Sequence, residues 1–345
     1  MPSPYWSQKA VPSAGEICGY TVTTDRMPLQ NGKGEIGAHL FFTAYTSASS
    51  DQAADSGTVR PLLFAFSGGP GLASTLLHLG AIGPKRVRFT PEGQIVGPPY
   101  EIVENPHTLL DQADLVFLDP IGTGFSEVTQ PNTRREYWGI QQDIEAIGEF
   151  IRAYLAQYDR WFSPLYLLGT SYGTARAAGL ADHLLGLGIG LSGLVLVSPG
   201  LDWLTGDPRR GHDLPYVLAL TAAINYYLRT ELGIVSSKEY CLFNKEANDV
   251  WDWGAGGQGY PERAEALRNA MTKNPRMKVF IASGYFDLTT PYRETQHTLT
   301  HLGLDVSLRA SIRTEMYESG HAIYLDSASL PKFKADIAKF IRREV

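Results

Sequence analysis

The stretch that decides the fold is Leu167-Leu168-Gly169-Thr170-Ser171-Tyr172-Gly173-Thr174. The apolar run 164–168 predicts a buried strand, and the alanine-rich segment 175–185 predicts a helix. A Gly-x-Ser-x-Gly motif between a strand and a helix is typical of a nucleophile elbow, a strained turn that lifts a serine hydroxyl above the sheet edge. The flanking glycines let strand and helix approach closely because they carry no side chain. Ser171 is therefore the candidate nucleophile.

Apolar runs along the rest of the chain predict the sheet in which this strand lies. Further strands are expected at 61–66, 115–118, 191–198, 278–282 and 310–317, and helices within 136–158, 294–302 and 330–343. Two more strands, 17–24 and 38–45, flank a turn-rich patch and predict an antiparallel start. Strands that alternate with helices indicate an α/β fold with a central, mostly parallel sheet flanked by helices.

The segment 200–274 interrupts this alternation. It is rich in Trp, Tyr and Gly and has no strong strand pattern. We therefore expect a mainly helical cap at 200–274, inserted into a core made of residues 1–199 and 275–345.

Composition narrows the class of protein. The chain has 345 residues, of which 43% are hydrophobic and 19% charged, so a sizeable core is available. The net charge is -6 and no block of like charge stands out, which argues against a nucleic-acid partner or an anionic membrane surface. No apolar run approaches the ~18 residues that a membrane span needs.

Cysteine usage and the first residues bear on the compartment. Cys18 and Cys241 are too few for a disulfide framework and are expected to be free buried thiols, with a single bridge as the alternative. Residues 1–14 lack the apolar core of a signal peptide. The sequence predicts a cytoplasmic protein, or a secreted or periplasmic one from which a signal peptide was removed.

A serine becomes a nucleophile only beside a base, and the base needs a group that orients it. In hydrolases built on a nucleophile elbow, the chain order is Ser, then Asp or Glu, then His. Asp287 follows the predicted strand 278–282, and His321 follows the strand 310–317. Because carboxyl ends of parallel strands meet at one sheet edge, we predict a triad of Ser171, Asp287 and His321. The alternatives are a helix cap for Asp287 and a surface histidine for His321.

An oxyanion hole needs backbone N–H groups aimed at the developing charge. The first donor is expected from Tyr172, directly after the nucleophile, and the second from the glycine-rich loop after the strand 61–66. Gly68 and Gly69 occupy that loop, where a glycine lets the main chain approach a substrate carbonyl. A plain Gly-Pro turn is the alternative interpretation.

Five segments, taken in order, resemble the serine carboxypeptidase family: residues 66–71 (FSGGPG), 118–126 (LDPIGTGFS), 169–173 (GTSYG), 284–287 (GYFD) with Pro291, and 320–321 (GH). The resemblance extends from about Gly34 to the C-terminus, is weakest in the cap, and is greatest to bacterial-type members, with a short cap. It implies an α/β-hydrolase fold, with Ser171 as nucleophile, Asp287 as acid and His321 as base. It also implies oxyanion donors at the Gly69 and Tyr172 amides. No metal or cofactor is required.

The chain departs from this family at two positions. The family's loop usually begins with Asn where this chain has Ser67, and its elbow usually has Glu where this chain has Thr170. In the family those side chains hold the substrate's C-terminal carboxylate, and the protonated Glu ties activity to acidic pH. A further Glu of some members would fall at Ala81 and is absent. Ser67, Gly68 and Thr170 remain candidate substrate-binding residues, and we expect activity to rise with pH as His321 loses its proton.

These observations favour a serine hydrolase that cleaves a peptide amide or an ester through an acyl-enzyme on Ser171. The alternative is a small-molecule esterase, amidase or acyltransferase that does not require a free substrate C-terminus. A third hypothesis is a non-catalytic binding protein that retains the fold. The sequence leaves the oligomeric state open, a homodimer included.

Overall fold

The computed structural model describes residues 5–13, 16–30, 34–48, 59–90, 94, 96–201, 214–254 and 263–344. Two parts of the predicted cap, 202–213 and 255–262, lie outside the described residues. The side chain of Cys18 does so too, whereas Cys241 is a free, half-buried thiol.

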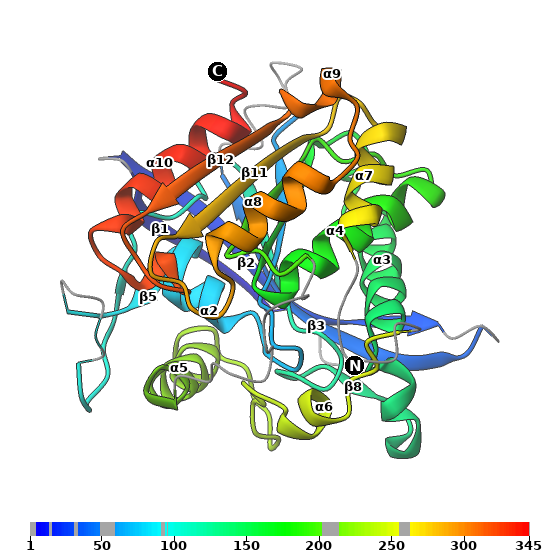
Figure 1. Cartoon of the computed structure of the whole chain (residues 1–345). Helices are drawn as coiled ribbons and strands as arrows, with labels where there is room; N and C mark the ends of the chain where they lie inside the picture. Colours follow the sequence, from blue (N-terminus) through cyan, green and yellow to red (C-terminus); the bar gives the residue numbers. More distant parts are fainter. Residues whose placement is uncertain are drawn as a thin grey trace.

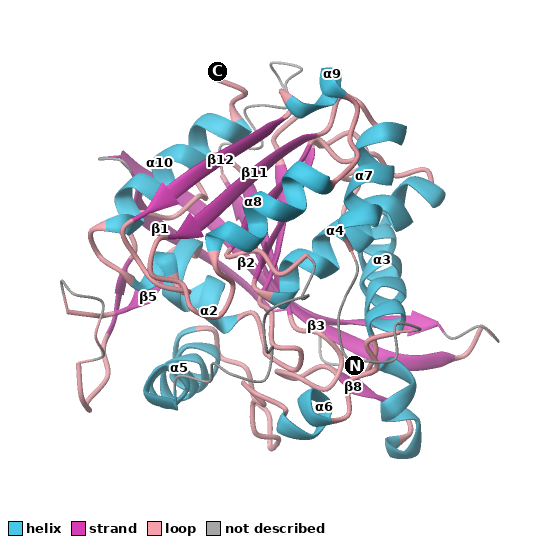
Figure 2. Cartoon of the chain, viewed as in Figure 1, coloured by secondary structure: helices cyan, strands magenta, loops and turns pink. Residues whose placement is uncertain are grey.

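A single large sheet runs through the protein, as the magenta arrows of Figure 2 show. Its strand order is β1-β2-β3-β7-β4-β9-β10-β11-β12. The pairs β1–β2, β2–β3 and β3–β7 are antiparallel, and from β7 to β12 all neighbours are parallel. The strands are β1 (Tyr5–Ser13), β2 (Glu16–Gln30), β3 (Ile36–Ser47), β4 (Leu62–Phe66), β7 (Asp114–Leu118), β9 (Leu165–Thr170), β10 (Gly193–Val197), β11 (Lys278–Gly284) and β12 (Ile312–Tyr317).

Three short strands lie apart from this path. β8 (Glu127–Val128) pairs with β3, and β5 (Lys85–Val87) pairs with β6 (Ile102–Glu104) in a separate antiparallel ribbon.

Helices cover both faces of the sheet (Figure 1). One face is covered by α3 (Ile140–Gln157), α4 (Tyr172–Gly186), α7 (Ala264–Lys273) and α8 (Tyr292–His301). The other face is covered by α10 (Ser329–Ile341) and by the π-helical turn η1 (His78–Ile82), against which α5 (Leu214–Tyr226) packs. The α/β-hydrolase class predicted from the sequence, with a mostly parallel sheet between helical layers, is confirmed.

The strand pattern explains why both faces are covered. In β10, Leu194 and Leu196 are buried in the core under α3 and α4, whereas Val195 and Val197 are buried in the core under α10. Successive side chains of a strand point to opposite faces, so a continuous apolar run requires a helical layer on each side. The continuous apolar run Gly193–Val197 therefore forms a strand inside the sheet, with a helical layer on each face.

The remaining short helices belong to the segments of the chain that connect the strands. They include α2 (Thr75–Leu77), α6 (Lys245–Asp249) and α9 (Val306–Arg309). Cys241 and Phe243, within the predicted insertion 200–274, form isolated backbone bridges with Gly124 and Leu72, in the loops after β7 and β4. This part of the chain thus contacts the carboxyl edge of the sheet. Helix α7, inside the predicted insertion 200–274, packs against α4 and contributes Leu267 and Met271 to the core.

None of the helices in the described ranges has the length and apolar character needed to cross a membrane.

Candidate active site

Ser171 lies on a tight turn between β9 and α4, with φ 57° and ψ -127°. Positive φ is unfavourable for a residue with a side chain, so the turn stores backbone strain. A Cβ on Gly169 would lie 2.1 Å from the Gly173 oxygen, and one on Gly173 would lie 3.0 Å from the Phe66 oxygen. Both glycines are therefore required by close backbone approach, as the elbow interpretation predicts.

Asp287 and His321 are in contact. Nδ1 of His321 lies 2.8 Å from Oδ2 of Asp287, although the two residues follow different strands, β11 and β12. The Asp287 carboxylate is fully buried, and the His321 side chain remains 29% exposed. An imidazole with one nitrogen on a buried carboxylate has its other nitrogen directed elsewhere, which is the arrangement of a base held by an orienting acid.

The environment of Asp287 keeps its carboxyl ionised. Its Oδ1 accepts hydrogen bonds of 2.9 Å from the amides of Thr289 and Thr290, and its Oδ2 accepts one of 2.7 Å from the Thr290 hydroxyl. Burial raises the pKa of Asp287, but the hydrogen bond and charge of His321, with the Thr290 bonds, outweigh burial and lower the pKa below its ordinary value.

The end of β10 links the nucleophile and histidine segments. The Ser171 amide donates a hydrogen bond of 3.0 Å to the Val197 carbonyl, and the next residue, Ser198, donates its hydroxyl to the His321 carbonyl at 2.7 Å. Within the described residues, the Ser171 hydroxyl forms no hydrogen bond to His321. In free hydrolases this bond is often long and tightens when substrate binds.

The glycine-rich loop after β4 lies directly against the elbow. A Cβ on Gly68 would lie 2.6 Å from the Thr170 oxygen, 2.8 Å from the Tyr172 nitrogen and 2.9 Å from Cβ of Ser171. Gly69 has φ +105°, a conformation that glycine adopts readily. The two backbone segments expected to form the oxyanion hole are thus side by side.

The two residues that replace the family's carboxylate-binding side chains are both buried. Ser67 is fully inaccessible, and among the described residues its hydroxyl has no hydrogen-bond partner. Thr170 is 3% exposed. Burial raises the pKa of Tyr324 to about 12, and the Thr170 side chain lies close enough to this phenol to offset part of the rise. Neither hydroxyl is open to solvent, and among the described residues the one on Ser67 is left without a hydrogen bond.

Sequence reasoning missed a buried ion pair beneath the elbow. Nε of Arg176 on α4 lies 2.7 Å from Oδ2 of Asp143 on α3, and neither side chain is more than 4% exposed. The signal was present as a lone arginine within the alanine-rich segment 175–185, since an arginine on a buried helix face must have a partner. Ser198 and Thr290 were missed as well, because short hydroxyl residues have no distinctive pattern.

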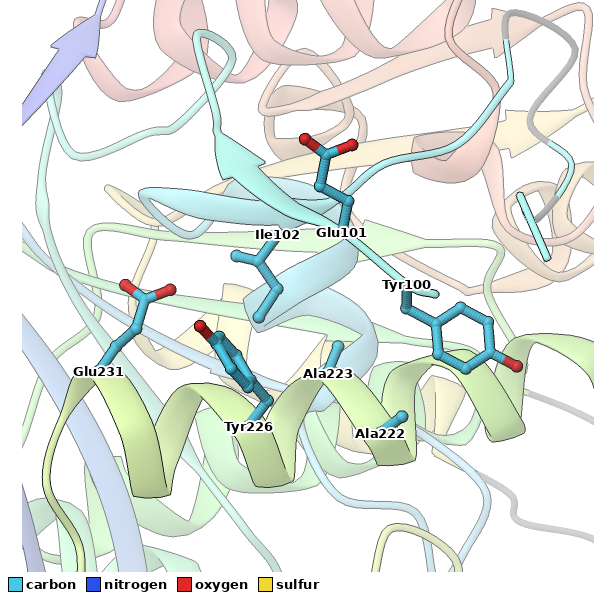
Figure 3. A pocket seen from close by; sticks show the side chains of 7 residues that line it. All are labelled: Tyr100, Glu101, Ile102, Ala222, Ala223, Tyr226 and Glu231. Atoms are coloured by element: carbon cyan, nitrogen blue, oxygen red, sulfur yellow. The ribbon is translucent and has the colours of Figure 1, made fainter. Parts of the chain in front are cut away.

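A separate hollow lies between α5 and the β6 strand (Figure 3). The cavity, of about 400 Å³, is lined by Tyr100, Glu101, Ile102, Ala222, Ala223, Tyr226 and Glu231. Its two carboxylates are matched by cations: Glu231 lies 3.0 Å from Lys85, and Glu101 lies 2.9 Å from Arg88. None of these residues belongs to the predicted active site.

The strand order, the elbow and the Asp287–His321 pair together define an α/β-hydrolase with a candidate serine-type site. The family model described as serine carboxypeptidase matches residues 18–186, and the family resemblance predicted from the sequence is confirmed over this range.

Solved structures share the fold. The prohormone-processing carboxypeptidase of Saccharomyces cerevisiae is 15% identical with a TM-score of 0.61, and the match covers 97% of this chain and 92% of that chain. A hypothetical protein of Pseudomonas aeruginosa is 14% identical with a TM-score of 0.51, and the match covers 93% of this chain and 99% of that one. A search of curated proteins found no match. The family match and the shared fold support a serine hydrolase.

Proposed function

We propose that the protein is a serine hydrolase of the carboxypeptidase type, which cleaves an amide or ester bond through an acyl-enzyme on Ser171. The observation that carries this proposal is the 2.8 Å contact between His321 Nδ1 and the buried Asp287 carboxylate. This contact lies at the carboxyl edge of the parallel strands, which is also the edge at which Ser171 follows β9.

The proposed reaction follows from these roles. His321 Nε2 takes the proton of the Ser171 hydroxyl while Oγ attacks the substrate carbonyl carbon, and the oxyanion that forms accepts hydrogen bonds from the Gly69 and Tyr172 amides. The tetrahedral intermediate then expels the amine or alcohol, which takes the proton from His321. Water, activated by His321 in turn, hydrolyses the ester on Ser171. Asp287 accepts a hydrogen bond from the Nδ1–H of His321 and holds the imidazole in this tautomer throughout.

Labelling tests the catalytic proposal. A fluorophosphonate reacts with an activated serine, so the wild-type protein should be labelled at Ser171, as located by peptide mass spectrometry. Ser171→Ala should not be labelled, and His321→Ala should be labelled at least about 100-fold more slowly, since a general base contributes about that much or more. A folded wild-type protein that resists the probe would favour a non-catalytic binding protein instead.

A second candidate function is a small-molecule esterase, amidase or acyltransferase without a requirement for a free substrate C-terminus. The specific observation in its favour is that Ser67 is fully buried and Thr170 is 3% exposed, so neither hydroxyl is open to a substrate carboxylate. A carboxylate moved from water needs strong hydrogen bonds or a cation, and burial of an unpaired charge is costly. With no exposed hydroxyl at either position to hold a carboxylate, the site suits an uncharged substrate group better.

Three matched substrates separate the candidates: a blocked dipeptide with a free carboxylate, its C-terminal amide and its methyl ester. A carboxypeptidase should favour the free acid in kcat/KM by at least about tenfold, because a hydrogen bond to a charged group contributes about 1.5–3 kcal/mol. The second candidate predicts equal or faster cleavage of the ester and amide.

A further inference from the structure

Arg176 is the largest fully buried side chain among the described residues, and its contacts are unusual for a core position. Its Nε lies 2.7 Å from Asp143, and its Nη1 donates a hydrogen bond of 2.6 Å to the Ser67 carbonyl. The guanidinium also lies over the rings of Phe66 and Tyr172, with Cζ 5.4 Å and 5.0 Å from the ring centroids. One side chain thus contacts both ends of the predicted oxyanion hole.

Asp143 completes the connection from the opposite side. Its Oδ2 accepts the hydrogen bond from Arg176 and a second one of 3.1 Å from the Tyr172 hydroxyl. The Tyr172 ring is also packed edge-on against Trp251 and Trp253, at centroid distances of 5.5 Å and 5.6 Å. The residue that supplies one oxyanion amide is therefore fixed through its own side chain.

The Ser67 carbonyl fixes the other segment. Because a peptide unit is planar, the hydrogen bond from Arg176 to the Ser67 oxygen sets the orientation of the Ser67–Gly68 peptide. The Gly69 amide belongs to the next peptide, so this bond constrains it through Gly68. Carbonyls further along the loop are held by other residues: Pro70 accepts from Nδ2 of Asn248, and Gly71 accepts from the Asn244 amide. Arg176 is the contact at the Ser67 end of the loop.

We propose that Arg176 and Asp143 are positioning residues of the oxyanion hole, whose ion pair sets the separation of the Gly69 and Tyr172 amides. The inference rests on the proposed function. It requires arginine specifically, because the planar guanidinium donates to Asp143 and to the Ser67 carbonyl at once, whereas lysine offers a point charge on a flexible stem. Neither residue touches substrate.

Three substitutions test the proposal: Arg176→Lys, Asp143→Asn and Tyr172→Phe. For hydrolysis of p-nitrophenyl acetate, Arg176→Lys and Asp143→Asn should lower kcat about 10- to 100-fold, somewhat less than loss of a whole oxyanion donor, with KM changed little. Affinity for a trifluoromethyl ketone, whose adduct carries an oxyanion, should fall in parallel with kcat. Tyr172→Phe keeps the ring and should lower kcat less than either.

Arg160→Met is the matched control. It breaks the ion pair of Arg160 with buried Asp114, 2.6 Å apart, at the amino end of β7 and thus at the opposite edge of the sheet. This variant should lose stability in urea yet keep kcat per folded molecule. The proposal is overturned if Arg176→Lys and Asp143→Asn, once folded, keep wild-type kcat, or if Arg160→Met loses kcat equally.

A readout independent of turnover separates this proposal from the proposed function. In ¹⁵N-labelled protein, Arg176→Lys should shift the amide resonances of Gly69 and Tyr172, and Arg160→Met should not. Unchanged resonances in Arg176→Lys would refute the positioning role even in an active enzyme. If Arg176→Lys shifts these resonances but the wild-type protein neither hydrolyses the ester nor reacts with fluorophosphonate, only the hydrolase proposal fails.

Discussion

The Ser198 hydroxyl donates a hydrogen bond of 2.7 Å to the carbonyl oxygen of His321. The carbonyl of the preceding residue, Val197, accepts a hydrogen bond from the Ser171 amide, so the end of β10 connects the candidate nucleophile to the candidate base. Ser171 follows β9 and His321 follows β12, and these two strands are not neighbours in the sheet. Strand β10 lies next to β9, between the two. Ser198 thereby positions the histidine segment.

Ser198→Gly is the suitable variant, because Ser198 has φ 48°, which glycine accepts without strain. We expect kcat to fall by up to about tenfold, since the lost hydrogen bond contributes about 1 kcal/mol to holding the His321 segment. The matched control is Thr300→Ala, which removes a hydroxyl-to-carbonyl bond of 2.7 Å on exposed α8 and should leave kcat unchanged. Wild-type kcat in Ser198→Gly would contradict the positioning role.

Substitution of Ser171 separates strain from catalysis. Both Ser171→Ala and Ser171→Gly should lose activity by about 10⁴-fold or more, because the nucleophile is gone. Ser171→Gly should be more stable than Ser171→Ala by about 1 kcal/mol, since only glycine relieves a backbone at φ 57°. Urea unfolding measures the difference. Equal stability of the two variants would mean that the elbow is not strained.

Gly68→Ala tests the contact between the oxyanion loop and the elbow. The added Cβ would meet backbone atoms of Thr170 and Tyr172 within 2.8 Å, so the loop must move away and kcat should fall at least about tenfold, as expected when an oxyanion donor is misplaced. Gly186→Ala, at the end of α4, has nothing within 4 Å of the new Cβ and should keep full kcat. A Gly68→Ala enzyme with unchanged kcat would show that this approach is dispensable.

Asp287→Asn should lower kcat about 10⁴-fold, because the amide leaves the imidazole in the wrong tautomer.

The pH dependence of stability should change in Asp287→Asn too. The pKa of Asp287 is lowered in the folded state, so its stabilising contribution is present above the ordinary value of 3.8 and is lost as the pH falls. The difference in unfolding free energy between wild type and variant should therefore shrink in acid. A difference that grows in acid would contradict the assigned direction.

Asp119 should have the opposite pH dependence. Burial raises its pKa to about 6, despite hydrogen bonds from the Ser74 amide and the Tyr240 hydroxyl. Between 3.8 and about 6 the folded state holds the proton and the unfolded state does not, so stability falls as the pH rises through this window. At about 1.4 kcal/mol for each pKa unit, the loss is about 3 kcal/mol.

Urea titrations of wild type and Asp119→Asn at pH 4, 5, 6 and 7 isolate this contribution. The wild-type advantage over the variant should decrease from pH 4 to pH 6 and then stay level. An advantage that rises with pH would mean that Asp119 is ionised and stabilised in the folded protein.

Much of the architecture could be predicted from local patterns. The apolar runs at 61–66 and 191–198 each contain a strand of the parallel sheet, and the run 278–282 is the first part of β11, because a strand buried on both faces must be apolar. The helix within 136–158 was predicted from its isoleucine spacing and begins at Ile140. The first strand, β1 (Tyr5–Ser13), is not expected from the sequence, because the segment lacks a regular apolar–polar alternation and contains Pro12.

The sequence by itself determined the elbow at Ser171, the fold class and the chain order of the candidate triad, because these depend on local residue types and on strand succession. Only the tertiary structure decided that Asp287 contacts His321, that Ser67 and Thr170 are buried, and that Arg176 is joined to Asp143 and the Ser67 carbonyl. These partners are far apart in sequence. Their meeting depends on how the sheet and helices pack, which no local pattern specifies.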